Sequence, residues 1–161
     1  MASDTLLKWP KNELVFVIVV LVSVFTVSRI QLITGQMKAR DAQRKADVEL
    51  VGRALLSYYA DYETYPAASE SGKIALCGFR ASQACEWGQG GLVDEEGVTY
   101  LKNLPQEPLS DSGRKYVYVP SLARDHFRIY IALEHKKDKG IRPDLTVECG
   151  RDVQCNWYVE Y

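Results

Sequence analysis

The sequence predicts an α+β protein in which a long N-terminal membrane helix continues as a spine packed against a small antiparallel β-sheet. Three patterns predict this fold. The stretch Leu14–Val27 carries no charge and presents large or β-branched apolar residues on every side, which suits lipid better than a soluble core. Beyond Gly35, apolar residues recur at a helical period of about 3.6. Two later stretches, 114–120 and 126–134, alternate apolar and polar residues as half-buried strands do.

The membrane segment is short unless Arg29 reaches the interface with its side chain. Roughly 14 uncharged residues fall below the ~20 that span a bilayer, but the segment extends to Ile33 if Arg29 snorkels. The proposed anchor residues lie along this segment: Leu14, Phe16, Ile18, Leu21 and Phe25.

The second part of the helix is expected to be amphipathic and to end near Tyr65-Pro66, because a residue before proline is biased away from the α region. Its predicted apolar face is Ala39, Ala42, Ala46, Leu50, Ala54, Leu55, Tyr58 and Tyr62. Opposite charges four residues apart, such as Asp41 with Lys45, are expected to add a few tenths of a kcal/mol each on the exposed face. The predicted organisation is a polar leader (1–12), a membrane half (13–35), an amphipathic half (36–65) and a globular head (66–161).

Charge argues against nucleic-acid binding by bulk electrostatics, since the net charge is -1. The local exception is a basic patch formed by Lys38, Arg40, Arg44 and Lys45. A solvated face beside the membrane is the favoured interpretation, and a contact with anionic lipid or DNA is the alternative.

Four cysteines, Cys77, Cys85, Cys149 and Cys155, lie outside the helix. Their spacings lack the C-x2-C pairs that structural zinc sites usually use, which favours disulfides over a four-cysteine zinc site. Local pairing, Cys77 with Cys85 and Cys149 with Cys155, is preferred to the two crossed alternatives. Disulfides require an oxidising compartment. The positive-inside rule points the other way, because more basic residues follow the apolar segment than precede it.

The head is expected to begin with a long irregular loop, 67–97, pinned by the first cysteine pair. Residues 121–125 are predicted to connect the two strands as a hairpin, and 136–144 to form a charged turn. Further edge strands are predicted within 145–149 and 156–161.

No catalytic pattern is found, and we predict that the chain is not an enzyme. His126 and His135 are expected to be surface residues outside any metal-binding spacing. The glycines of 88–91 do not follow a strand or open a helix, so they are interpreted as a flexible loop rather than a phosphate site.

Several segments together resemble the type IV pilin family, including the major pseudopilins of type II secretion. These are Glu13 at the head of the apolar helix, the run RDAQRKADV at 40–48, the run YYADYETYP at 58–66 and the run YLKNLPQEP at 100–108. Strand candidates 116–118 and 130–134 follow in the order seen in that family. The resemblance covers Glu13 to about Glu134.

The resemblance implies a structural subunit or assembly factor of a type IV pilus or type II secretion pseudopilus. Its partners would be other pilin or pseudopilin subunits, an inner-membrane assembly platform and membrane lipid. The head would lie on the extracytoplasmic side of a single-pass anchor, or in an extracellular filament. Glu13 would set the register between subunits, because an unpaired charge in an apolar filament core costs several kcal/mol.

Two features of the chain bear on that resemblance. Lys8, followed by Trp9 and Pro10, stands where the family's leader peptidase cuts after a small residue, nearly always glycine. An uncleaved, membrane-tethered binding domain that does not polymerise is therefore the alternative function. Major pseudopilins also hold calcium, for which Asp138, Asp144 and carbonyls near Gly140 are the candidates here; two acids are a weak nucleus for such a site, so a solvated turn without a cofactor is favoured.

Overall fold

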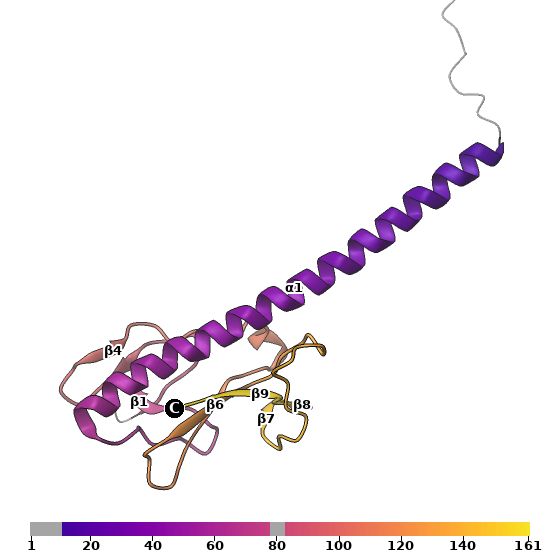
Figure 1. Cartoon of the computed structure of the whole chain (residues 1–161). Coiled ribbons are helices and arrows are strands. Elements are labelled where there is room, and N and C mark those ends of the chain that lie inside the picture. The colour runs from indigo at the N-terminus through magenta and orange to yellow at the C-terminus, as the bar shows by residue number, and fades with distance from the viewer. Residues whose placement is uncertain (1–10, 78–82) are drawn as a thin grey trace, which may run out of the picture. The chain divides into compact units, whose positions relative to one another are not determined.

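A single long helix forms most of the N-terminal third of the protein. The structure is a computed structural model that describes residues 11–77 and 83–161. Helix α1 runs from Lys11 to Tyr62, and the chain divides into two compact units between Met37 and Lys38 (Figure 1). The α+β class is therefore confirmed at this level: a long N-terminal helix followed by small antiparallel sheets.

The apolar segment of α1 has exposed side chains, and two of its hydroxyl groups bond to the helix backbone. Nearly every residue from Leu14 to Ile33 is exposed. The Ser23 and Thr26 hydroxyls donate to helix carbonyls one turn earlier, at 2.7 to 2.9 Å. This bonding satisfies these two hydroxyl donors within the helix itself, which suits a lipid environment.

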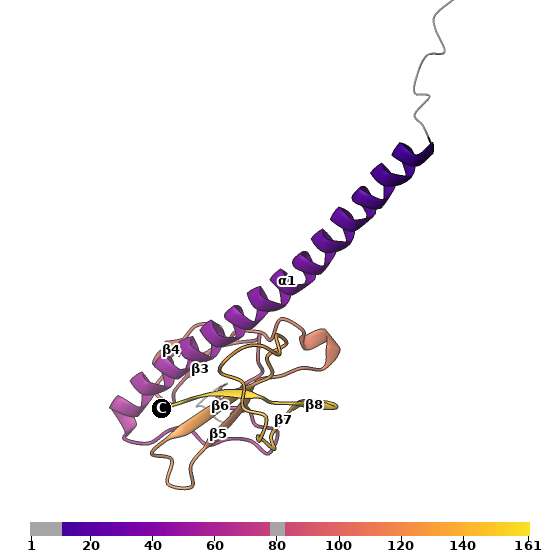
Figure 2. The ribbon, with the colours of Figure 1, turned by 45° about the vertical axis from the view of Figure 1, so that its right-hand side comes forward.

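Over the described residues, the globular head contains four small antiparallel sheets (Figure 2). The largest has the order β5-β6-β9, formed by Val117–Pro120, Phe127–Ile131 and Trp157–Glu160. The two-stranded sheets pair β1 (Ala75–Cys77) with β2 (Gln83–Ala84), β3 (Leu92–Val93) with β4 (Thr99–Leu101), and β7 (Glu148–Gly150) with β8 (Val153–Gln154). A short 3₁₀ helix, η2, covers Ser110–Ser112.

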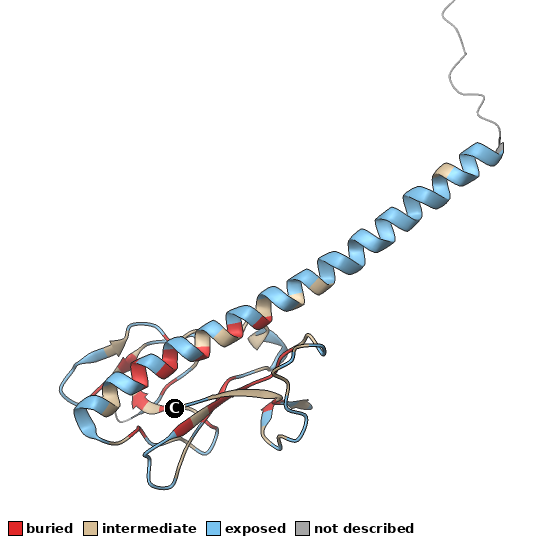
Figure 3. Ribbon diagram, in the orientation of Figure 1, coloured by how far each residue is buried: buried red, intermediate tan, exposed pale blue. Residues whose placement is uncertain are grey.

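The β5-β6-β9 sheet separates two hydrophobic clusters. The larger cluster joins Val48, Val51 and Leu55 of α1 to the sheet face formed by Tyr116, Tyr118, Phe127, Ile129 and Ile131. The smaller lies on the other face, where Val117 and Tyr130 pack on Cys149 and Cys155. Figure 3 shows the buried positions of the head half of α1 along the side that faces the sheet. Strand β6 is thus buried on both faces over much of its length, whereas the sequence predicted half burial.

The buried face of α1 differs from the predicted apolar face. Asp41, Arg44, Val48, Val51 and Leu55 are buried, spaced three and four residues apart, as one side of a helix requires. Ala39, Ala42, Ala46 and Leu50 of the predicted face are exposed, so that prediction is wrong for its first half. Burying these alanines would remove little apolar area from water. Asp41 and Arg44 are buried instead, because they bond to polar groups of the head.

The two main strands and their connection are confirmed. β5 and β6 fall within the predicted stretches, and the Ser121 amide donates to the His126 carbonyl at 2.9 Å to close the hairpin. Of the two predicted edge strands, 156–161 joins the central sheet as β9, while 145–149 supplies β7, which pairs only with β8 among the described strands.

The outer edge of β5 is already occupied. The Tyr118 amide donates to the Gly72 carbonyl at 2.8 Å, and Pro120 has no amide hydrogen to offer. This edge is therefore closed to pairing with another strand in the way natural sheets protect their edges.

The helix ends three residues before the predicted boundary. Its last residue is Tyr62, and Glu63 adopts a left-handed conformation with φ of 54°. The Glu63 amide donates to the Tyr59 carbonyl at 2.8 Å, a common way of ending a helix.

The stretch predicted as a flexible glycine loop makes a close backbone contact at Gly91. A side chain at Gly91 would meet the carbonyl oxygens of Leu101 and Lys102, with the added Cβ only 2.1 Å from the nearer. Gly91 lets β3 lie close to the segment after β4, so it is a packing residue as well as a loop residue.

Candidate functional site

The expected anchor residues lie on all sides of α1 and contact little else. Leu14, Phe16, Ile18, Leu21 and Phe25 are each at least half exposed. The helix has one segment long and apolar enough to cross a membrane, and none of it is buried. Length and composition of this kind fit a membrane span and equally an N-terminal signal sequence.

Glu13 lies in the first turn of α1 and is exposed. A carboxylate there interacts favourably with the helix dipole. The leader residues Lys8, Trp9 and Pro10 lie outside the described residues, so the cleavage prediction stays a prediction.

A buried ion cluster joins α1 to the head, centred on Arg44, whose side chain has no exposed surface. Its Nε donates to Glu107 Oε1 at 2.6 Å, and its Nη1 donates to Asp41 Oδ1 at 2.8 Å and to Glu134 Oε1 at 2.7 Å. Nη2 lies 2.5 Å from the same Glu107 oxygen, without a hydrogen bond of its own. One guanidinium thus contacts carboxylates from three separate parts of the chain.

Asp41 and Arg40 complete the cluster. Asp41 accepts the backbone amides of Glu134 and His135 at 2.8 to 3.1 Å, just after β6. Arg40 donates to both carboxylate oxygens of Glu134, at 2.7 and 2.6 Å. These hydrogen bonds, first from Arg40 and then from Arg44, lower the pKa of Glu134 to about 2 despite its burial.

The ion cluster corrects the interpretation of the basic patch as a solvated face, because two of its four residues point to acids of the head. Arg40 and Arg44 turn toward the acids of the head, whereas Lys38 is exposed and Lys45 is half-buried. Lys45 pairs with Asp138 at 2.8 Å rather than with the predicted Asp41. A fully buried arginine requires carboxylate partners, and here Glu107 and Glu134 of the head add to Asp41 of the helix itself.

The tyrosines of the 58–66 run hold the other end of the helix. The Tyr62 hydroxyl donates to Asp94 Oδ2 at 2.9 Å, which raises the pKa of Tyr62 to about 12. The Tyr100 hydroxyl reaches the same oxygen at 3.0 Å and Asp61 at 2.7 Å. Tyr58 stacks on Tyr62 with ring centroids 4.5 Å apart. These contacts fasten the β3-β4 loop to the last turns of α1.

Both local disulfides are present. Cys77 pairs with Cys85 and Cys149 with Cys155, and Cys149 and Cys155 are almost fully buried in the smaller cluster. The favoured pairing is confirmed, and a zinc site using these four residues is excluded in this state.

The calcium candidates do not meet in this structure. Asp138 accepts hydrogen bonds from Lys45 and from the Gly140 amide, and Asp144 is exposed. Over 11–77 and 83–161, no group of three or more histidine, cysteine or acidic side chains is arranged to hold a metal ion. Of the two histidines, His126 is exposed beside Asp125 and His135 is half-buried near Asp41.

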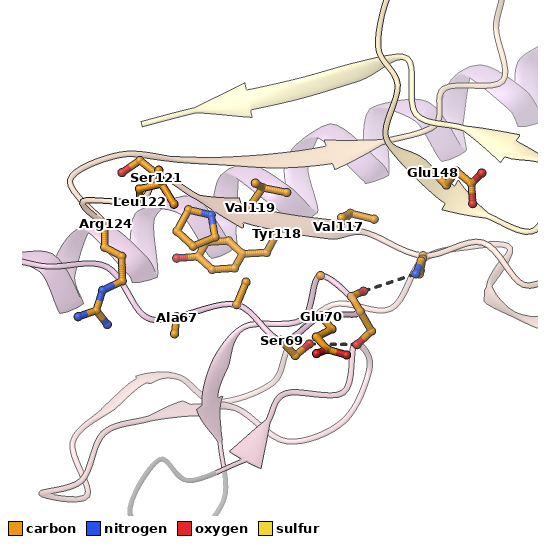
Figure 4. A pocket seen from close by; sticks show the side chains of 15 residues that line it. Ala67, Ser69, Glu70, Val117, Tyr118, Val119, Ser121, Leu122, Arg124 and Glu148 are labelled. Atoms are coloured by element: carbon orange, nitrogen blue, oxygen red, sulfur yellow. Dashed lines mark hydrogen bonds between the residues drawn. The ribbon is translucent and has the colours of Figure 1, made fainter.

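A hollow lies between the segment before β1 and strand β5 (Figure 4). It encloses about 510 Å³ and is lined by the 67–72 segment, by Val117–Leu122, and by Lys115, Arg124 and Glu148. The Lys115 ammonium donates to the Ser71 carbonyl across one end at 3.4 Å. Its lining mixes aliphatic side chains with separated charges of both signs.

Sequence reasoning missed Glu107 and Glu134 as partners of the helix. The one available signal for Glu107 was its place in the 100–108 run, directly before Pro108. Glu134 stands at the end of a strand candidate and carries no local mark of its role. Chemically, the arrangement can fix the spine to the head.

Comparisons with protein-family models, with curated proteins and with solved structures gave no significant match. The pilin resemblance therefore depends on the sequence segments themselves.

Proposed function

We propose that this protein is a structural subunit or assembly factor of a type IV pilus or type II secretion pseudopilus, anchored in the membrane before assembly. The observation that carries the proposal is that the two parts of α1 have different surroundings. The segment Leu14–Ile33 is apolar and exposed on nearly every side, while residues from Asp41 onward are built into the head.

An exposed apolar helix needs a second environment. In the membrane that environment is lipid; in a filament it is the same segment of neighbouring subunits. Exchange of one for the other requires that the head stay folded while the anchor changes surroundings. The buried ion cluster and the Tyr62-Asp94 contact favour such a head because they bind it to the later turns of α1 alone.

A substitution at Glu13 tests the proposed function directly. A carboxylate at the head of an apolar filament core needs a cation from a neighbour: the N-terminal amine of a cleaved subunit, or Lys11 or Lys8 of an uncleaved one. Glu13→Gln should leave the chain inserted and folded but reduce co-assembly with partner pilins, measured by crosslinking and by filament yield. Glu49→Gln, on the exposed side of the helix, makes the same charge change and should assemble normally.

The tethered binding domain is the second candidate, favoured by Lys8 at the expected cleavage position. The N-terminal residue and mass of the protein from its native membrane decide whether the leader is kept. Lys8→Gly should make the chain cleavable by a prepilin peptidase. If the native chain is uncut and Glu13→Gln assembles as well as the parent, the tethered domain is the better account.

A further inference from the structure

A cationic hollow opens at the start of the head, beside the first turns of α1 after Met37. It encloses about 360 Å³. Its lining comes from one face of the helix and from the connection that follows β6: Lys38, Asp41, Ala42, Lys45, His135, Lys137 and Asp138.

The two acids in this lining are already engaged. Asp41 accepts hydrogen bonds from Arg44 and from the Glu134 and His135 amides. Asp138 accepts from Lys45 at 2.8 Å and from the Gly140 amide at 2.9 Å. Neither carboxylate is left to neutralise another cation.

Two lysines remain without a carboxylate. Within the described ranges 11–77 and 83–161, neither Lys38 nor Lys137 forms a salt bridge, and both are exposed at the hollow. With Lys45, whose ammonium is held by Asp138, they place three lysines in the lining of one hollow. An oxyanion is the ligand that this arrangement would attract.

The place of Lys38 in the sequence indicates where that oxyanion would come from. Lys38 follows Ile33, the last apolar residue of the membrane segment, by five positions, or roughly 7.5 Å along a helix. The headgroup layer on each side of the hydrocarbon core is about that thick. Lipid phosphates are therefore the oxyanions nearest to Lys38 in an anchored chain.

We propose that this hollow binds the phosphate of an anionic phospholipid headgroup. The inference rests on the membrane-anchored state of the proposed function but not on polymerisation. Lys38 and Lys137 would contact the phosphate, and Lys45 would add to the field while held by Asp138. The near-neutral chain, with its net charge of -1, favours a lipid over a nucleic acid.

Native mass spectrometry of the full chain in detergent micelles tests the proposal. Phosphatidylglycerol and phosphatidylcholine with the same acyl chains are titrated separately, and we expect tighter binding of phosphatidylglycerol. In Lys38→Gln/Lys137→Gln that preference should fall by about fivefold for each lysine removed, the usual effect of a lysine close to an anionic surface.

Two variants serve as controls. Lys102→Gln/Lys139→Gln removes the same charge from two exposed positions outside the hollow and should keep the preference. Lys38→Arg/Lys137→Arg retains both charges and should also keep it. Unchanged thermal unfolding in all three variants confirms that only the surface has changed.

Three results would overturn the proposal: equal binding of the two lipids, a preference that survives Lys38→Gln/Lys137→Gln, or glycerol phosphate binding as tightly as the lipid, which would make this a soluble-phosphate site. Binding of a short DNA duplex with the same lysine dependence, in place of lipid, would do the same. A chain that prefers phosphatidylglycerol yet never forms filaments would contradict the proposed function and leave the lipid site standing.

Discussion

Arg44 Nε donates to Glu107 Oε1 at 2.6 Å, which joins helix α1 to a loop 63 positions later in the sequence. Both side chains are buried, at 0% and 4% exposure. Ion pairs removed from water cost desolvation and repay it only with good geometry and further hydrogen bonds. Here Asp41 and Glu134 supply those further bonds, so the contact fixes one position of the helix against the head.

Arg44→Met should therefore strongly destabilise the head. The substitution keeps an unbranched side chain but leaves Asp41, Glu107 and Glu134 facing one another without their shared cation. We expect a loss of about 3 to 5 kcal/mol in the free energy of unfolding, measured by urea denaturation of the full chain in detergent. Arg53→Met, at an exposed position, should cost less than about 0.5 kcal/mol. A cost below about 1 kcal/mol for Arg44→Met would show that the cluster contributes little.

Stability should fall in acid because of Glu134. Its pKa lies near 2 in the folded protein against an ordinary 4.5, so its contribution is fully present above pH 4.5 and is lost as the pH falls toward 2. The shift corresponds to about 3 kcal/mol. Glu134→Gln should lower stability at neutral pH and flatten the loss between these limits, measured by urea unfolding across that range. Parallel pH profiles for parent and variant would contradict the assignment.

Gly52 makes room for the aromatic ring of Tyr161. A side chain at Gly52 would place its Cβ 2.2 Å from a ring carbon of Tyr161, which also stacks on Phe127 at 5.5 Å between centroids. Gly52→Ala should cost about 1 to 3 kcal/mol through overpacking, measured by thermal unfolding.

A double-mutant cycle gives the control for Gly52. In a Tyr161→Ala background the cost should disappear, and alanine should even stabilise the helix by up to about 1 kcal/mol. Gly35→Ala, where the added Cβ has no atom within 4 Å, should leave the head's unfolding temperature unchanged. If Gly52→Ala costs the same with and without the Tyr161 ring, the clash is not the cause.

The disulfides should form in protein exported to an oxidising compartment. No free thiol should be titratable before reduction, and peptide mapping should recover Cys77–Cys85 and Cys149–Cys155. Replacing either pair with alanines should cost on the order of 2 to 3 kcal/mol, since each closes a short loop. Stoichiometric zinc with four free thiols would refute this state of the protein.

Features that depend on residues close together in the sequence could be predicted from the sequence alone. The uncharged run Leu14–Val27 determines an apolar helix, because helical geometry then exposes apolar side chains in every direction. Alternation determined β5 and β6, and short spacing determined which cysteines pair. Each of these rests on residues a few positions apart, whose relative placement the local backbone already limits.

Only the tertiary structure decided which face of α1 is buried after Met37. Ala39, Ala42 and Ala46 fit a helical period as well as the residues that are buried. They stay exposed because burying an alanine removes too little apolar area from water to favour that face. Arg44 could become interior only because Glu107 and Glu134, 63 and 90 positions away, converge on it. The free energy of a buried charge depends on such distant partners, so no local pattern around Arg44 could reveal that it is buried.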